Sequence, residues 1–254
     1  MAPPKARLGT TKANARTALS RTLLTPRLGF GAGCVLKLVD TEKMHEEAVQ
    51  AIADRYGKKY TWDLKLKLMG TTGADSARMV IDGLNLPLTV DDYLVDLGRI
   101  YAEKYPKVTL IPGVDRLVRH LHKHGVPLAI ATSSKRVSFT LKTARHKELL
   151  ALFHHVVCSG DDPAVKHGKP HPDIFLVAAS KFEGKPPPEK ILVFEDAPNG
   201  VTAALAAGMQ VVMLPDPRMD EQNKRRATLC IDSLMNFKPE VFGLPPFEDT
   251  AKNC

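Results

Sequence analysis

The feature that most constrains the fold is a regular alternation of two patterns in the second half of the chain. Short runs rich in strand-forming residues lie at 126–132, 155–160, 191–196 and 210–214. Stretches with helical spacing lie before and between them, at about 113–124, 138–152, 172–182 and 199–207. Strands that alternate with helices form βαβ units, which join into a parallel sheet. The sequence therefore predicts an α/β protein with a Rossmann-like sheet.

A block with a different pattern lies before this region. In residues 44–105 apolar side chains recur at the spacing of one helix face. One such face comprises Ala48, Val49, Ile52 and Tyr56, and another comprises Tyr93, Leu94, Leu97 and Tyr101. We therefore expect a small all-helical block here.

The positive charge of the chain is concentrated at its N-terminus. Residues 1–39 carry seven Lys and Arg residues and no Asp or Glu, so the remaining 215 residues hold 29 basic and 28 acidic residues. A body with so little net charge is not a basic nucleic-acid binder. No apolar run approaches the ~20 residues that span a bilayer, and the first residues lack the apolar core of a secretory signal. We expect neither a nucleic-acid nor a membrane partner.

The cysteines and the N-terminal composition bear on the compartment. The four cysteines show no CxxC spacing and are too few for a disulfide framework, which favours a reduced, cytoplasmic compartment. The acid-free stretch "ARTALSRTLLTPRLGF" has the composition of a mitochondrial transit peptide, so a mitochondrial location is the alternative. We expect the first part of 1–39 to be disordered, because it can bury little apolar surface.

Two segments that follow predicted strands offer groups suited to phosphate. "LAIATSS" ends in Thr132, Ser133 and Ser134, whose hydroxyl and backbone N–H groups suit a phosphate oxygen. A helix cap explains the same three residues. "HGKPHPDIF" places the cation of Lys169 beside a proline just before a helix, where a solvated loop lysine is the alternative interpretation.

An acidic pair ends the apolar run at 191–196. Glu195 and Asp196 come directly after four apolar residues. Adjacent carboxylates at the mouth of a buried strand need a compensating charge, and a hard divalent ion such as Mg²⁺ often supplies it. The pair therefore indicates a metal site at least as readily as a structural one.

Longer stretches of the chain resemble a known family. They include "DTEKMHEEAV", "IPGVDRLVRHLHKHGVP", "GDDPAVKHGKPHPDIFLVAA" and "LVFEDAPNGVTAALAAGMQVVMLPDP". Over about 40–249 the sequence is similar to the haloacid dehalogenase (HAD) superfamily of phosphohydrolases, in the branch of the pseudouridine-5′-phosphatases and the related glycerol-phosphate phosphatases. The resemblance implies a HAD-like core at 107–249, with a weak strand near 28–39 and a helical cap inserted at 43–105. It also implies a small phosphorylated metabolite as ligand, either pseudouridine 5′-phosphate or glycerol phosphate.

Carried over to this sequence, the family pattern assigns roles to the residues described above. Phosphate would be bound by Thr132, Ser133, Lys169 and Asn199. Mg²⁺ would be bound by Asp196 and Glu195. Lys169 would also act in catalysis, because its charge neutralises the transferring phosphoryl group.

The first motif of the family is missing from the chain. It consists of two aspartates before the "DTE" at 40–42: a nucleophile that attacks phosphorus, and a general acid and base. Counting back from Asp40 places these positions at Gly33 and Val35, and residues 1–39 contain no carboxylate. We therefore predict that the chain as written is inactive. We also predict weakened Mg²⁺ binding, because two oxygen ligands are lost.

Three explanations of the missing motif stay open. The segment before Asp40 is an alternative exon or a gene-model error in an active enzyme, which is the explanation we favour. Alternatively, the chain is a catalytically dead phosphate-metabolite-binding or interaction protein, or a different nucleophile serves. The sequence does not indicate an oligomeric state, and a monomer is the default.

Overall fold

The computed structural model describes residues 28, 32–39, 41–69, 71 and 73–248. The predictions for the N-terminal leader and its disorder concern residues that lie outside these ranges. Asp40 also lies outside them, whereas both of its neighbours in sequence are described.

A single sheet of six parallel strands forms the centre of the described structure, in the order β3-β2-β1-β4-β5-β6. The strands are β1 (Gly33–Leu36), β2 (Leu128–Thr132), β3 (His155–Cys158), β4 (Ile191–Glu195), β5 (Gln210–Met213) and β6 (Leu229–Cys230). The predicted α/β fold with a parallel sheet is confirmed, as are the four strand-forming runs. The sixth strand has only two residues and was not predicted.

The short β1 occupies the middle of this sheet. Val35 pairs with Ala129 of β2 on one side and with Val193 of β4 on the other. All four residues of β1 are buried, because helices cover both faces of the sheet. The weak strand expected near 28–39 is therefore present as the central strand, and its apolar side chains hold it between two longer neighbours.

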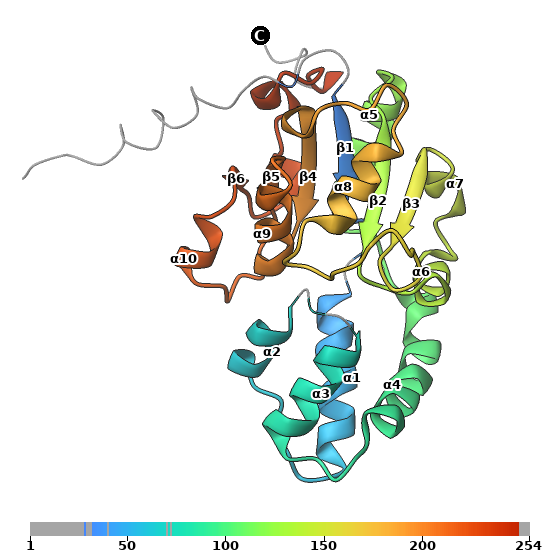
Figure 1. Cartoon of the computed structure of the whole chain (residues 1–254), viewed down its shortest axis with the longest axis vertical. Coiled ribbons are helices and arrows are strands. Elements are labelled where there is room, and N and C mark those ends of the chain that lie inside the picture. The colour runs from blue at the N-terminus through green and yellow to red at the C-terminus, as the bar shows by residue number, and fades with distance from the viewer. Residues whose placement is uncertain (1–27, 29–31, 40, 70, 72, 249–254) are drawn as a thin grey trace, which may run out of the picture.

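Helices and helical turns cover the two faces of the sheet (Figure 1). The helices are α5 (Val114–Lys123), α6 (Arg136–Thr143), α7 (Lys147–Leu150), α8 (Asp173–Ser180), α9 (Pro198–Ala206) and α10 (Glu221–Lys224). Single 3₁₀ turns lie at Tyr105–Lys107, Pro188–Lys190, Leu234–Asn236 and Pro239–Phe242. Phe175 of α8 and Val201 of α9 pack on one face of the sheet. Leu117 of α5 and Phe242 pack on the other.

Four further helices lie together beneath the carboxyl ends of the strands (Figure 1). They are α1 (Glu42–Asp54), α2 (Trp62–Leu68), α3 (Gly73–Leu84) and α4 (Val90–Lys104). Their buried side chains form a separate apolar cluster that includes Val49, Val80 and Tyr93. We call α1–α4 the cap; the exact domain boundaries stay a prediction.

Two linkers connect the cap to the sheet, and they run side by side. Val39 on the outgoing linker and Leu110 on the returning one form an antiparallel bridge. The backbone N–H of Ile111 also donates to the carbonyl oxygen of Leu38 over 3.0 Å. The cap is therefore attached at one place, next to the end of β1.

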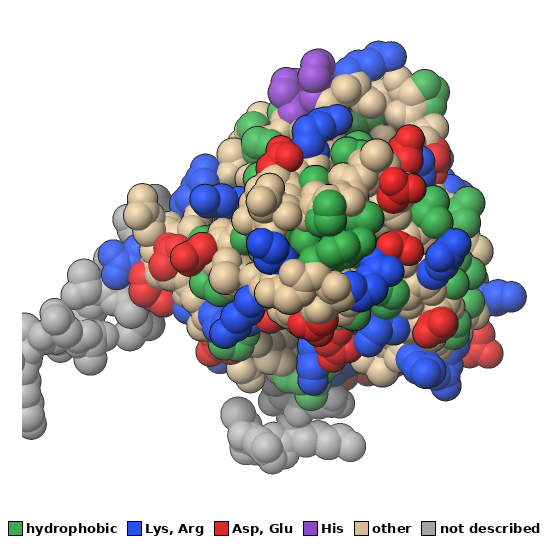
Figure 2. Space-filling view, turned by 90° about the horizontal axis from the view of Figure 1, so that it is seen from below, with side chains coloured by type: hydrophobic (Ala, Val, Ile, Leu, Met, Phe, Trp, Pro, Cys, Tyr) green, Lys and Arg blue, Asp and Glu red, His purple; other side chains and the backbone are tan. Residues whose placement is uncertain are grey.

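The surface of the cap carries charges of both signs. Viewed from the cap side, Lys and Arg side chains are interspersed with Asp and Glu (Figure 2). Among the described residues, no helix is both long and apolar enough to cross a membrane.

Candidate functional site

The carboxyl ends of three adjacent strands bring the predicted site residues to one edge of the sheet. β2 ends at Thr132 and β4 at Glu195, and β1 runs between them. Lys37 follows directly after β1, and its backbone N–H donates to the carbonyl oxygen of Phe194 over 3.3 Å. Lys37 therefore stands at the centre of this edge, where ligands bind in sheets of this kind.

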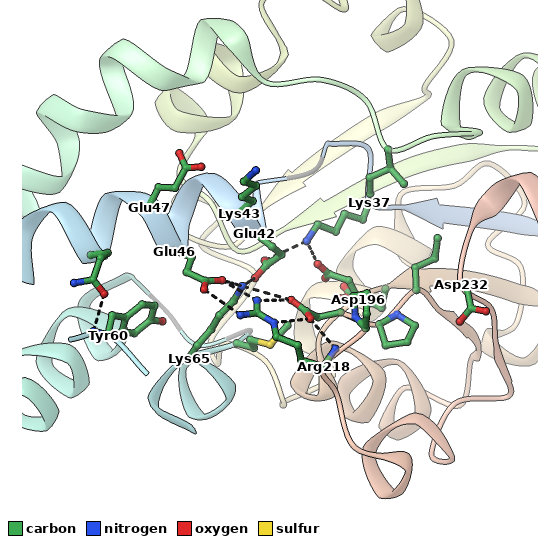
Figure 3. Close-up of a pocket in the computed structure, with 18 of the residues that line it drawn as sticks. Lys37, Glu42, Lys43, Glu46, Glu47, Tyr60, Lys65, Asp196, Arg218 and Asp232 are labelled. Atoms are coloured by element: carbon green, nitrogen blue, oxygen red, sulfur yellow. Dashed lines mark hydrogen bonds and ion pairs between the residues drawn. The ribbon is translucent and has the colours of Figure 1, made fainter. Parts of the chain in front are cut away.

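The ammonium group of Lys37 joins two carboxylates. It forms an ion pair with Asp196 and lies 3.4 Å from an oxygen of Glu42, the first residue of α1 (Figure 3). The side chains of Lys37 and Asp196 are only 22% and 14% exposed. Burial opposes the charge of Lys37, but attraction to Asp196 and Glu42 outweighs it and raises the pKa of the lysine. Lys37 is therefore a fixed cation within the site.

The acidic side of the site keeps an excess of negative charge. Burial raises the pKa of Asp196 above its ordinary value, and Lys37 opposes this shift. The neighbouring carboxylates of Glu42 and Glu195 raise it further. Three carboxylates thus share a small, poorly solvated volume, which costs free energy unless cations are held among them.

Lys169 compensates the second member of the acidic pair. Its ammonium group forms an ion pair with Glu195, and both side chains are 6% exposed. Gly200 of α9 makes room for this carboxylate, since a Cβ atom at position 200 would overlap the oxygens of Glu195. The ring of Phe175 lies 4.9 Å from the Lys169 nitrogen and closes the other side. The structure thus brings Lys169, Glu195 and Asp196 together.

A second lysine, which sequence reasoning missed, lies near Lys37. Lys142 of α6 donates to the hydroxyl oxygen of Ser134 over 3.0 Å, and its nitrogen lies 5.0 Å from the ring of Tyr105. Burial, reinforced by the like charge of Lys37, lowers the pKa of Lys142 to about 8. The charge of Glu42 opposes this shift only in part, so an anion in this place would further stabilise the charged form of Lys142.

The other predicted phosphate ligands have partners within the protein. The hydroxyl of Thr132 accepts a hydrogen bond from the backbone N–H of Ser134 over 3.2 Å, which shapes the turn that contains the half-buried Ser133. Asn199 donates to the carbonyl oxygen of Met69 over 2.8 Å. Asn199 therefore ties α9 to the cap, a contact that the sequence did not indicate.

The two positions counted as the missing aspartates do not lie at the strand end. Gly33 begins β1 opposite Ile191, and a Cβ atom there would meet the ring of Phe182 at 3.0 Å. Val35 is 1% exposed within the sheet. The family spacing counted back from Asp40 predicts that Gly33 and Val35 lie at the site. The pairing of β1 with β4, however, determines where the strand ends. In the structure β1 ends at Leu36, and Lys37 is the first residue after it.

A cavity of about 890 Å³ opens between the cap and the ends of β4 and β5. Its lining contains eight Asp and Glu side chains and four Lys and Arg side chains. Arg218 bridges Glu46 of α1 and Asp216, with each shortest distance 2.8 Å, and stacks on Trp62 at 4.4 Å. Lys65 of α2, 2% exposed, lies 2.8 Å from Glu46. The pair of Arg218 and Glu46 ties the cap to the core beside the cavity. Acidic side chains outnumber basic ones in the lining, which disfavours anions there.

The donor set does not fit the Mg²⁺ site that the sequence predicts. Mg²⁺ requires near-octahedral oxygen ligands and gives up its waters reluctantly. Asp196 and Glu195 are the predicted ligands, but each already pairs with an ammonium group, that of Lys37 or Lys169. Elsewhere in the described chain, His167, His171 and Asp173 could place three ligand atoms within 4.8 Å of one another, but they do not line the cavity.

Two kinds of signal could have pointed to the missed residues. Lys37 follows the apolar run of β1 directly, just as Glu195 follows that of β4. Lys142 lies in the last turn of α6, and its side chain reaches back to Ser134, which precedes that helix and follows β2. No local sequence pattern predicts the contact between Lys142 and Ser134.

Several sequence relatives of this chain carry the names of phosphatases. A family model described as "Haloacid dehalogenase-like hydrolase" matches residues 37–214. The chain is 48% identical over 216 residues to "(DL)-glycerol-3-phosphatase 2" of Arabidopsis thaliana, covering 84% of this chain and 90% of that protein. It is 46% identical over 212 residues to "Probable pseudouridine-5'-phosphatase" of Drosophila melanogaster, covering 84% and 92%.

Solved structures share the fold at lower sequence identity. A β-phosphoglucomutase from Clostridium difficile has a TM-score of 0.68 at 20% identity, with 82% of this chain and 94% of that chain covered. A hydrolase from Deinococcus radiodurans R1 with bound phosphate and sodium has a TM-score of 0.67 at 24% identity, with 88% and 100% covered.

Proposed function

Because this chain belongs to the haloacid dehalogenase-like hydrolases, we propose that it binds small phosphomonoesters at the carboxyl edge of its sheet without hydrolysing them. The observation that carries this proposal is Lys37 at the end of β1. Hydrolysis through a covalent intermediate needs a nucleophile and a group that exchanges protons at this strand end. A protonated lysine paired with Asp196 supplies neither.

The proposed seat of the phosphate lies between β1 and β2. Lys142 and Ser134 offer a cation and a hydroxyl group, and Thr132 ends β2 beside them. Lys37 and Lys169 add positive charge from the other side. A dianionic phosphate here would have three ammonium groups around it and would keep away from the acidic part of the cavity.

The substrate class is proposed from the relatives. Their names point to glycerol 3-phosphate and pseudouridine 5′-phosphate, which are both small monoesters. The cavity of about 890 Å³ under the cap is lined by Lys37 and Asp196 but not by Thr132, Ser134 or Lys142. The leaving group would therefore extend from the proposed phosphate seat past Lys37 into this cavity. We propose no nucleic-acid or membrane partner and a monomer in solution.

The compartment is a separate proposal. A cytoplasmic location stays the first choice, and a mitochondrial one is the alternative. A relative from Arabidopsis thaliana that is 47% identical over 216 residues is named "(DL)-glycerol-3-phosphatase 1, mitochondrial", which supports the alternative.

Binding and turnover should be measured together on the purified full chain. We expect calorimetry to show saturable binding of glycerol 3-phosphate or pseudouridine 5′-phosphate. Release of inorganic phosphate should fall at least ~10³-fold below that of a relative with both aspartates, because a whole nucleophilic constellation is missing. Lys142→Met should weaken binding roughly 10-fold, whereas Lys147→Met, which removes an exposed lysine at the start of α7 outside the cavity, should leave it unchanged.

An active phosphatase is the second candidate, favoured by the high identity to relatives named as phosphatases. Turnover by the unmodified chain that Lys142→Met slows and Lys147→Met does not would support this candidate. It would also exclude a contaminating enzyme and reject the binding-only function.

A further inference from the structure

The carboxylates at the strand ends require a cation. Glu42, Glu195 and Asp196 come together from α1 and the end of β4, and Lys169 compensates only Glu195. Buried carboxylates that lack a partner are strongly destabilising. Asp196, which is 14% exposed, therefore needs a second positive charge, which either a bound ion or a side chain can supply. The neighbouring Glu42 also lies 3.9 Å from the ammonium group of Lys65.

Lys37 meets this need from the central strand. Its nitrogen pairs with Asp196 and reaches Glu42 at 3.4 Å, so one ammonium group serves both carboxylates. The side chain points from the end of β1 toward both acids (Figure 3). The same backbone position is fixed by the hydrogen bond from the Lys37 N–H to Phe194.

We propose that the ammonium group of Lys37 is the resident cation of this site, standing where a divalent metal would have to bind Asp196, and that the site therefore takes phosphomonoesters without a metal. The identity of the ligand rests on the function proposed above. The replacement of the metal by Lys37 rests on the contacts of Lys37, Asp196 and Glu42 alone.

Two physical effects favour the lysine over a free ion. Lys37 is part of the chain, so placing its charge at Asp196 costs no translational freedom, whereas a captured ion loses it. A Mg²⁺ ion would also have to shed waters and then lie against a like charge that is only 22% exposed. The lysine would have to leave its two carboxylates before the metal could enter.

The first test titrates Mg²⁺ alone into the full chain and follows heat release and the thermal unfolding midpoint. The unmodified chain and the control variant Lys147→Met should show no saturable binding and no stabilisation. Lys37→Met should gain Mg²⁺ binding at least ~10-fold tighter than the unmodified chain, because the competing charge is gone. Lys37→Asp should bind more tightly still, since it adds an oxygen ligand.

Each opposite outcome overturns the proposal. Stoichiometric Mg²⁺ binding by the unmodified chain would show that Lys37 does not exclude the metal. Failure of both Lys37 variants to gain binding, with circular dichroism showing a native fold, would show that Asp196 offers no cation position. Asp196→Asn added to Lys37→Met should abolish the gained binding; if it does not, the metal lies elsewhere.

The second test separates this proposal from the proposed function. Binding of glycerol 3-phosphate is measured with Mg²⁺ and with a chelator. We expect the unmodified chain to bind glycerol 3-phosphate with equal affinity in both conditions. For Lys37→Met we expect the affinity for glycerol 3-phosphate to depend on Mg²⁺. Binding that requires Mg²⁺ in the unmodified chain overturns the metal replacement but keeps the binding function. Turnover, or no phosphate binding in either condition, rejects the function, and the Mg²⁺ titration still decides the role of Lys37.

Discussion

The carboxyl ends of β1 and β4 lie side by side in the sheet, but they differ in what they carry. β4 ends in Glu195, followed by Asp196 and by α9, whose Gly200 fits against the glutamate. β1 ends in Leu36 and is followed by Lys37, although its four strand residues pair along β4 without a gap. The comparison shows that an apolar run is enough to form the central strand. The chemistry of the site depends on the residues that follow each strand. The formation of the strand and the chemistry at its end are therefore independent of each other.

The largest expected effect comes from a carboxylate placed inside β1. Val35→Asp should reduce the free energy of unfolding by more than about 4 kcal/mol, because it buries an unpaired charge between two strands. Val35→Ala, which removes volume without adding charge, should cost only about 2 kcal/mol. Urea denaturation measures both.

The corresponding double variant sharpens the same point. Gly33→Asp combined with Val35→Asp should not restore phosphatase activity, because both side chains lie in the sheet and not at its edge. A folded double variant that hydrolyses glycerol 3-phosphate would show that carboxylates at positions 33 and 35 reach the site, contrary to the pairing of β1 in the unmodified chain.

An intermediate effect is expected on the β4 side. Gly200→Ala should reduce the free energy of unfolding by about 1–3 kcal/mol, because the new methyl group displaces the buried carboxylate of Glu195 from Lys169. Gly98→Ala is the matched control: this exposed helical glycine of α4 has no atom within 4 Å of a new Cβ. That variant should gain about 0.5–1 kcal/mol in urea denaturation. Equal effects of the two variants would remove the special role of Gly200.

The smallest expected effect on stability comes from the ion pairs of Arg218, which lie between the cap and the core. Hydrogen bonds from Arg218 lower the pKa of Glu46 and of Asp216 to about 2, from 4.5 and 3.8. Because these pKa values are depressed in the folded state, their contribution is present above about pH 4.5 and is lost as the pH falls toward 2.

Arg218→Met should flatten this pH dependence. Solvent screens the pairs, since Arg218 is 47% exposed, so we expect a change of about 1 kcal/mol or less between the two ends of the window. Arg226→Met, which removes an exposed arginine of the same loop region, should keep the slope. Urea midpoints measured across this window compare the three proteins. An unchanged slope for Arg218→Met would show that these pairs do not contribute.

The fold could be predicted from the sequence because its signals are local. The apolar runs of β2–β5 and the amphipathic faces of the cap helices repeat at the period of the element that they form. β6 and α10 were missed, since two and four residues are too few to show a period. The acidic pair was found because it follows a buried strand without a break.

The site was predicted less completely because its contacts are distant in sequence. Lys37 and Asp196 are 159 residues apart, and the bond from Asn199 to Met69 spans 130. The family spacing counted from Asp40 assumes that the strand end keeps its place in the sequence. Strand pairing decides that place, and it requires the register between β1 and β4.

The bridge between Val39 and Leu110 brings together the two points at which the chain leaves the sheet and returns to it. Neighbouring strands lie roughly 5 Å apart, a gap that a tight turn can close. The helices between these points can therefore be lengthened, exchanged or deleted without shifting any strand. In evolutionary terms the cap over the strand ends is a module that can be exchanged as a unit. A lineage can change which molecule it admits by recombination at one junction and inherit the sheet intact.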